Sequence, residues 1–100
     1  MGPISTILTD ESKWTKGAFA RNQNGVVCDL YGADACKYCL TGFVCLVSQH
    51  DIKLRRKIYS KLDDAIVKYT KETNTSIMLF NDGMGTTFED VKKVLEIANL

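Results

Sequence analysis

The stretch Ala35-Cys36-Lys37-Tyr38-Cys39-Leu40-Thr41-Gly42-Phe43-Val44-Cys45-Leu46-Val47-Ser48 decides the fold, because it has the strongest apolar periodicity in the chain. One stripe of the helix that this stretch would form carries Cys36, Cys39, Leu40, Phe43, Leu46 and Val47, with Val44 widening it. Spacings of three and four residues are typical of a helix that buries one face. Asp34 stands just before the stretch and can cap its first turn. The sequence therefore predicts a central, buried helix over about residues 35–48.

Gly42 interrupts the apolar stripe of this predicted helix. A glycine inside a helix costs about 1 kcal/mol relative to alanine. Its presence indicates that another backbone segment, or alternatively a ligand, comes close to the helix at this point.

Further elements are predicted on both sides of the central helix. Apolar spacing predicts a short helix over residues 4–13 and a longer one over 52–71. Residues 19–21 and 26–28 have the character of short strands, and Asn24-Gly25 between them favours a tight turn, so we expect a small β-hairpin.

The C-terminal part of the chain gives one open and one clear assignment. Residues 76–80 fit either a buried strand or a single helical turn. Thr86 with Glu89 matches a capping box, and it predicts a last helix whose apolar face is formed by Phe88, Val91, Val94, Leu95 and Ala98.

Length and composition predict one compact domain over residues 1–100. The chain has 100 residues, of which 45% are hydrophobic and 25% charged, and it holds one proline. A chain of this size buries about 65% of its unfolded surface. The expected fold class is α+β, mainly α, with about four helices and a small β-hairpin. No stretch approaches the ~18 apolar residues of a membrane span, and no secretory signal is evident, so we expect a cytoplasmic protein without a membrane partner.

The charge balance argues against a nucleic-acid surface. Thirteen basic and 12 acidic residues give a net charge of +1, which is too balanced for a wide basic face. The densest basic run is Lys53-Leu54-Arg55-Arg56-Lys57. We interpret it as the solvated face of a helix, with a phosphate or RNA contact as the alternative.

The four cysteines do not form a recognisable metal or catalytic pattern. Cys36 and Cys39 have the Cys-x-x-Cys spacing, but no second ligand pair completes a zinc site. We therefore expect no metal, no cofactor, and four free thiols that are mostly buried. On one helix Cys39 would lie roughly 16 Å from His50, the single histidine, so a Cys–His dyad is not supported. No catalytic residues are assigned.

Three segments together resemble a family of small uncharacterised proteins, common in actinobacteria and their phages. The segments are Trp14 to Arg21, Cys39 to Gly42, and Phe80 to Asp82 with the Thr86 to Val91 stretch that follows. The family pattern is Trp-x-x-Gly-Ala-x-Ala-Arg, Cys-x-x-Gly and Trp/Phe-Asn-Asp, and the similarity spans about Ile7 to Leu95. The matching positions are Trp14, Gly17, Ala18, Ala20, Arg21, Cys39, Gly42, Asn81, Asp82, Thr87, Asp90 and Val91. Phe80 stands where tryptophan is usual.

The best candidates for a binding site are Trp14, Arg21, Asn81 and Asp82. If they converge, an Arg21–Asp82 contact would be either a structural tie or part of a ligand site. The first function hypothesis is a non-enzymatic binding protein, phage- or prophage-encoded, that acts on a host protein or a small molecule. The alternatives are a small hydrolase or transferase with a cleft around Asp82, and a nucleic-acid accessory protein. The sequence names no partner and gives no oligomeric state.

Overall fold

The computed structural model describes residues 2–100 and confirms the mainly α, α+β fold. Within these residues, five α-helices accompany one two-stranded antiparallel sheet. In chain order the elements are α1 (Pro3–Ile7), the 3₁₀ turn η1 (Glu11–Lys13), β1 (Ala20–Arg21), β2 (Lys37–Tyr38), α2 (Leu40–Ser48), α3 (Ile52–Thr70), α4 (Ile77–Asp82) and α5 (Phe88–Ala98).

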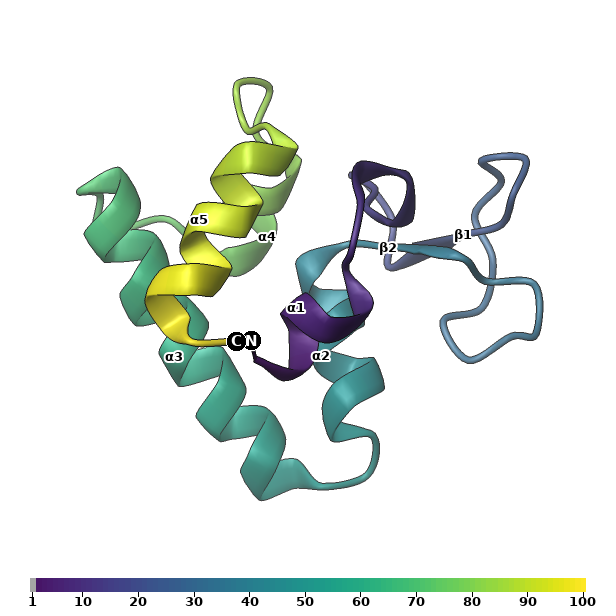
Figure 1. The fold of residues 1–100 in the computed structure, drawn as a ribbon, viewed down its shortest axis with the longest axis horizontal. Helices are drawn as coiled ribbons and strands as arrows, with labels where there is room; N and C mark the ends of the chain where they lie inside the picture. Colours follow the sequence, from purple (N-terminus) through teal and green to yellow (C-terminus); the bar gives the residue numbers. More distant parts are fainter. Residues whose placement is uncertain (1) are drawn as a thin grey trace.

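The helices pack around α2 and α3, and the sheet lies to one side of them (Figure 1). Helix α5 runs along α3, while α1 and α4 both contact α2. The sheet and its loops lie on the opposite side of α2 from α3 (Figure 1). The first turn of α1 meets the other end of the described chain, because the amides of Ile4 and Ser5 both donate to the carbonyl of Leu100, at 2.7 and 2.8 Å.

One hydrophobic core unites these helices. Leu40, Phe43 and Val44 of α2 are fully buried, which confirms that this helix is central. The other helices add Ile4, Ile58, Leu62, Ala65, Ile66, Ile77, Phe80, Val91, Val94, Leu95 and Ala98. No helix formed by residues 2–100 combines the length and the apolar character that crossing a bilayer requires.

The central helix begins later than the apolar stripe predicts. Helix α2 starts at Leu40, and its cap is Cys39, whose sulfur accepts the Gly42 amide at 3.3 Å. The predicted start near Ala35 and the predicted Asp34 cap are therefore wrong. The physical reason is long-range pairing: the Cys36 amide donates to the Arg21 carbonyl at 3.0 Å, which holds this segment extended and leaves Cys36 exposed.

The sheet also has a different partner from the predicted hairpin. The Asn22–Gly25 turn forms, with Gly25 at φ +79°, and Arg21 faces Val27 in an isolated bridge. The regular pairing, however, joins β1 to β2, with Ala20 opposite Tyr38. Residues 26–28 are therefore a short return segment at one side of β1 rather than a full strand.

Of the other predicted elements, one is confirmed, one is wrong, and the open one is now assigned. Helix α3 confirms the element expected over 52–71, and Asp51 caps it by accepting the Leu54 amide at 2.9 Å. The single helix expected over 4–13 is wrong, because the Asp10 side chain caps the separate turn η1 through the Ser12 amide. The open segment 76–80 is helical and belongs to α4, which Ser76 caps.

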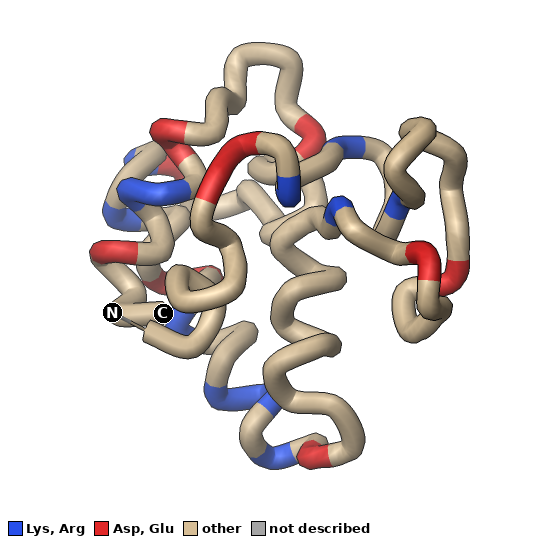
Figure 2. The backbone as a smooth tube through the Cα atoms, turned by 45° about the vertical axis from the view of Figure 1, so that its right-hand side comes forward, with Lys and Arg blue, Asp and Glu red and all other residues tan. Residues whose placement is uncertain are grey.

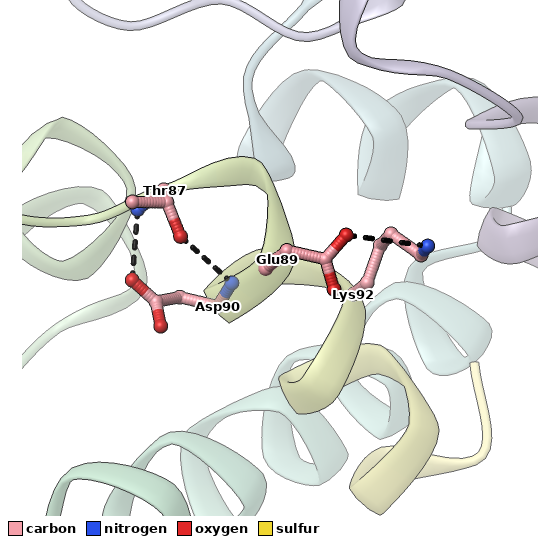
Figure 3. Close-up of polar contacts among 4 residues, drawn as sticks. All are labelled: Thr87, Glu89, Asp90 and Lys92. Carbon is pink, nitrogen blue, oxygen red and sulfur yellow. Dashed lines mark hydrogen bonds and ion pairs between the residues drawn. The ribbon is translucent and has the colours of Figure 1, made fainter.

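The capping box of α5 lies one residue later than predicted. Thr87 and Asp90 form it: the Asp90 amide donates to the Thr87 hydroxyl at 3.2 Å, and the Thr87 amide donates to the Asp90 carboxylate at 2.8 Å (Figure 3). The predicted Thr86–Glu89 box is wrong, since the Thr86 amide closes a turn onto the Gly83 carbonyl. Glu89 instead pairs with Lys92 at 3.6 Å on the exposed face (Figure 3).

We predict that Asp90 makes the fold acid-sensitive. The Tyr69 hydroxyl donates to its carboxylate at 2.6 Å and, together with the Thr87 amide, holds the pKa of Asp90 below the ordinary value of 3.8. A carboxyl with a lowered folded pKa stabilises the protein above its unfolded pKa, and that stabilisation is lost as the pH falls through the folded pKa. Asp90→Asn should cost about 1 kcal/mol at neutral pH and flatten the loss of stability between about pH 5 and pH 2.

Urea unfolding measured across this pH range checks the prediction. Tyr69→Phe is the matched variant, because it removes the largest cause of the lowered pKa but keeps the helix cap. It should flatten the same pH dependence in part. An Asp90→Asn profile parallel to that of the parent would contradict the prediction.

Candidate functional site

The side chain of Asn81 joins three segments that are distant in the sequence. Its Oδ1 accepts the indole N–H of Trp14 at 2.7 Å and the amide of Leu40, at the start of α2, at 3.0 Å. Its Nδ2 donates to the Thr15 carbonyl at 3.1 Å and to the Asp82 carboxylate at 2.8 Å. Asn81 thus connects α4 to the N-terminal loop and to the central helix.

These four bonds use the whole hydrogen-bonding capacity of a carboxamide, which has two acceptor sites and two N–H donors. Asn81 is only 1% exposed, and a buried amide without partners is costly. Aspartate has no N–H to donate to the Thr15 carbonyl, and an apolar residue would also leave the Trp14 indole N–H and the Leu40 amide without this acceptor. The position therefore requires a carboxamide of this length.

Asp82 extends the junction by one residue. Its Oδ1 accepts the Gly17 amide at 3.0 Å in addition to the Asn81 donor. Gly17 has φ +77°, a left-handed backbone that side chains disfavour, and this geometry turns its amide toward α4. Two donors on one oxygen fix the orientation of the carboxylate.

Trp14 is anchored on both its polar and its apolar atoms. Besides the Asn81 bond, its ring packs against Phe88 with 6.3 Å between centroids, and the Lys16 ammonium lies 5.4 Å from its ring centroid. Lys16 also donates to the Gly83 carbonyl, just after α4. The loop from Trp14 to Gly17 is thus bound to α4 at several points.

No hydrogen bond or ion pair found within residues 2–100 joins Arg21 to Asp82, so the contact considered as either a structural tie or part of a ligand site does not form. The Arg21 guanidinium donates instead to the Thr15 hydroxyl at 3.0 Å, to the Gly25 carbonyl at 3.0 Å and to the Lys16 carbonyl at 3.2 Å. Arg21 therefore braces the loop that carries Gly17 and the Asn22–Gly25 turn. The structure brings Trp14, Asn81 and Asp82 together. Arg21 does not bond to them but holds the loop through Thr15 and Lys16.

A pocket of about 280 Å³ opens beside this junction. The loop before β1, the return segment, the start of α2 and helix α4 all contribute to its wall. The lining residues are Gly17, Ala18, Phe19, Val27, Cys39, Met78, Asn81 and Asp82. The apolar side chains at the rim are well exposed: Phe19 is 51% exposed, Val27 61% and Met78 47%.

The sulfur of Cys39 is part of the pocket wall but is poorly placed for chemistry. Cys39 is 5% exposed. Burial raises the pKa of its thiol, and the amide hydrogen bonds from Gly42 and Thr41 offset this only in part. Because the thiolate is the nucleophilic form, the environment keeps Cys39 in its unreactive state.

The other cysteines correct the expectation that the thiols are mostly buried. All four are free, but Cys28 and Cys45 are half-buried and Cys36 is exposed. Cys36 faces solvent because its segment pairs with Arg21 rather than continuing the helix. No group of three or more His, Cys, Asp or Glu side chains within residues 2–100 is arranged to hold a metal ion.

Sequence reasoning found the polar part of this site and missed its apolar part. Trp14, Asn81 and Asp82 stood out because each belongs to a short segment that combines an aromatic or compact polar side chain with a nearby glycine. Phe19, Val27 and Met78 were placed in strands or in an open segment, where apolar residues are expected to be buried. Phe19 and Val27 are exposed on loop segments and Met78 on helix α4, and no spacing in the sequence signals that the three line one pocket.

Fold and site together define a small, mainly helical domain with a pocket at the meeting point of three segments. The chain belongs to a family of unknown function (DUF6197), whose model matches residues 4–99. The expected membership in an uncharacterised family is thereby confirmed, while the actinobacterial and phage distribution stays a prediction. No curated protein and no solved structure matches the chain.

Gly42 is explained by the backbone that forms one wall of the site. A Cβ on Gly42 would overlap the carbonyl oxygen of Phe19, which also accepts the Cys39 amide at 3.3 Å. The expectation that a second backbone approaches the helix here is confirmed. The close contact brings the Phe19 loop against the first turn of α2.

Gly42→Ala should therefore destabilise the protein, although alanine is the better helix former. We expect a loss of about 2 kcal/mol, because overpacking against a fixed backbone outweighs the gain in propensity. Gly85→Ala is the control, since nothing lies within 4 Å of the added Cβ, and it should change stability by less than about 0.5 kcal/mol. Denaturant midpoints measure both, and an unchanged or raised midpoint for Gly42→Ala would refute the close approach.

Proposed function

We propose that this chain is a non-enzymatic binding domain that recognises a protein partner by taking one of its side chains into the pocket. The observation that carries the proposal is the combination of a fixed polar wall with an exposed apolar rim. Asn81 and Asp82 are held by hydrogen bonds, whereas Phe19, Val27 and Met78 are left open to solvent. On the family resemblance alone, we also propose a phage- or prophage-encoded, cytoplasmic protein that acts on a host protein.

The size of the pocket supports a side chain as its occupant. Pockets for small molecules typically measure about 300–1,000 Å³, and this one, at about 280 Å³, is comparable with the smallest of them. Exposed apolar residues continue outside it, at Val26 and Leu79. A pocket for one anchor residue, surrounded by surface that excludes water, is how protein interfaces concentrate their binding energy.

The enzymatic alternative has less support. Cys39 is buried, and its sulfur accepts a hydrogen bond from its own helix. His50 lies beyond the other end of α2, and the nine residues of that helix span ~14 Å. A nucleophile needs a base within hydrogen-bond reach, and this pair does not meet that requirement.

The nucleic-acid alternative also loses support, because the Arg55 guanidinium is hydrogen-bonded within the protein. It donates to the Ser48 hydroxyl at 3.1 Å and to the Gln49 carbonyl, at the end of α2. Lys53, Arg56 and Lys57 remain for phosphates, which is too few for tight binding at physiological salt. Figure 2 shows basic and acidic residues mixed over the backbone.

Site-specific photo-crosslinking in cells of the native host tests the proposal. A photoreactive phenylalanine at Val27, on the pocket rim, should yield a discrete protein adduct. The same residue at Ile97, an exposed apolar position of α5 outside the pocket, should not. Ala18→Leu fills the pocket from its wall and should abolish the Val27 adduct, while the thermal midpoint stays close to that of the parent.

Met78→Trp fills the pocket from α4. It replaces Ala18→Leu as the blocked-pocket variant if Ala18→Leu does not fold. The proposal is overturned when Val27 gives no adduct, when Ile97 gives the same adduct, or when the adduct survives both filled pockets.

A further inference from the structure

The pocket contains one charged side chain, Asp82, and no ion pair found within residues 2–100 involves it. Of the eight residues that line the pocket only Asp82 is acidic, and no Lys, Arg or His is among them. Its Oδ1 accepts two neutral donors, the Gly17 and Asn81 N–H groups. Within residues 2–100 the Oδ2 atom of Asp82 accepts no hydrogen bond. The ion pair found in this part of the chain joins Lys92 to Glu89 and does not involve Asp82.

Two basic residues close to the pocket in sequence, Lys16 and Arg21, donate to groups other than Asp82. The Arg21 guanidinium donates to the Thr15 hydroxyl and to the carbonyls of Lys16 and Gly25. Lys16 lies over the Trp14 ring and donates to the Gly83 carbonyl. The carboxylate is thus fixed in orientation and keeps an acceptor oxygen for a partner, as a site for a cation requires.

The backbone around the pocket favours a cation over an anion. Amides in the first turn of a helix bind anions when they are unoccupied. Here the Leu40 amide is bonded to Asn81 and the Gly42 amide to the Cys39 sulfur. Helix α4 ends at Asp82, and the carbonyl end of a helix favours positive charge.

The apolar rim matches the stem of a basic side chain. Lysine and arginine carry aliphatic stems that pack on apolar surface while the charged group reaches a polar partner. Met78 and Val27 supply such a surface, and an exposed phenyl ring such as that of Phe19 also attracts cations. Uncharged apolar side chains would fit the rim but would leave the carboxylate facing apolar surface.

We infer that the pocket takes a basic side chain, lysine or arginine, from the protein partner, with Asp82 binding its charged group and the rim holding its stem. This inference rests on the proposed function and specifies the chemistry of the anchor residue.

A series of probes with one stem and different charge tests the inference. The probes are n-butylguanidinium, n-butylammonium, n-pentanol and pentanoate, titrated into ¹⁵N-labelled protein while the amide shifts of Gly17 and Ala18 are followed. Both cations should bind at least about tenfold more tightly than the alcohol, as a charge-assisted hydrogen bond allows, and pentanoate should bind most weakly. Added salt should weaken the cations and leave the alcohol unchanged.

Asp82→Asn provides the matched variant, because its carbonyl oxygen can still accept the Gly17 amide. The affinity of this variant for both cations should fall to its affinity for the alcohol. Asp34→Asn removes an acidic residue outside this pocket and should leave the cation preference unchanged. The charge series in the parent protein needs no variant, so the test stands even where Asp82→Asn does not fold.

The outcomes separate the two proposals. Alcohol binding that equals cation binding at Gly17 and Ala18, or tighter binding of pentanoate, overturns the basic anchor and leaves the binding domain intact. Cation binding that persists unchanged in folded Asp82→Asn also overturns it. The failure of the crosslinking test at Val27 overturns the proposed function itself.

Discussion

The carboxamide of Asn81 is the interaction on which the rest of the structure depends. It holds the Trp14 indole, the Thr15 carbonyl, the first amide of α2 and the Asp82 carboxylate at once. The helical core can form by apolar burial alone, but such burial is non-directional. The Asn81 side chain is the buried polar group that bonds to the N-terminal loop and to the start of α2 at the same time, and the Lys16 and Gly17 contacts with Gly83 and Asp82 add to the hold on the loop. Networks of this kind specify a unique arrangement only when every member is satisfied.

The pocket follows from this polar junction. Hydrogen bonds bind the loop that carries Gly17 to α4, and the apolar side chains that line the pocket between them lie outside the hydrophobic core. Phe19, Val27 and Met78 therefore stay exposed. Exposed apolar side chains grouped around a pocket are unusual for a small domain in water, and the binding role that we propose is consistent with their presence.

The parts of the fold that local pattern determines could be predicted from the sequence. Helices α3 and α5 have long amphipathic repeats and their own caps. The start of α2 could not be predicted, because residues 36–38 continue the apolar pattern but pair with residues 19–21. The same holds for the site. Its polar part could be predicted, because Asn81, Asp82 and Trp14 have side chains that form hydrogen bonds. The Arg21–Asp82 contact does not form, because the guanidinium donates to three other oxygen acceptors instead.

The free energy of unfolding of Asn81→Asp, measured by denaturant at neutral pH, tests this account most directly. The substitution keeps the size of the side chain and an acceptor for Trp14 and Leu40, but it removes both N–H donors and places a second carboxylate against Asp82. We expect a loss of about 3 kcal/mol or more, whereas Asn74→Asp in an exposed loop should cost less than about 0.5 kcal/mol. A loss for Asn81→Asp as small as that of the loop control would contradict the central role of the carboxamide.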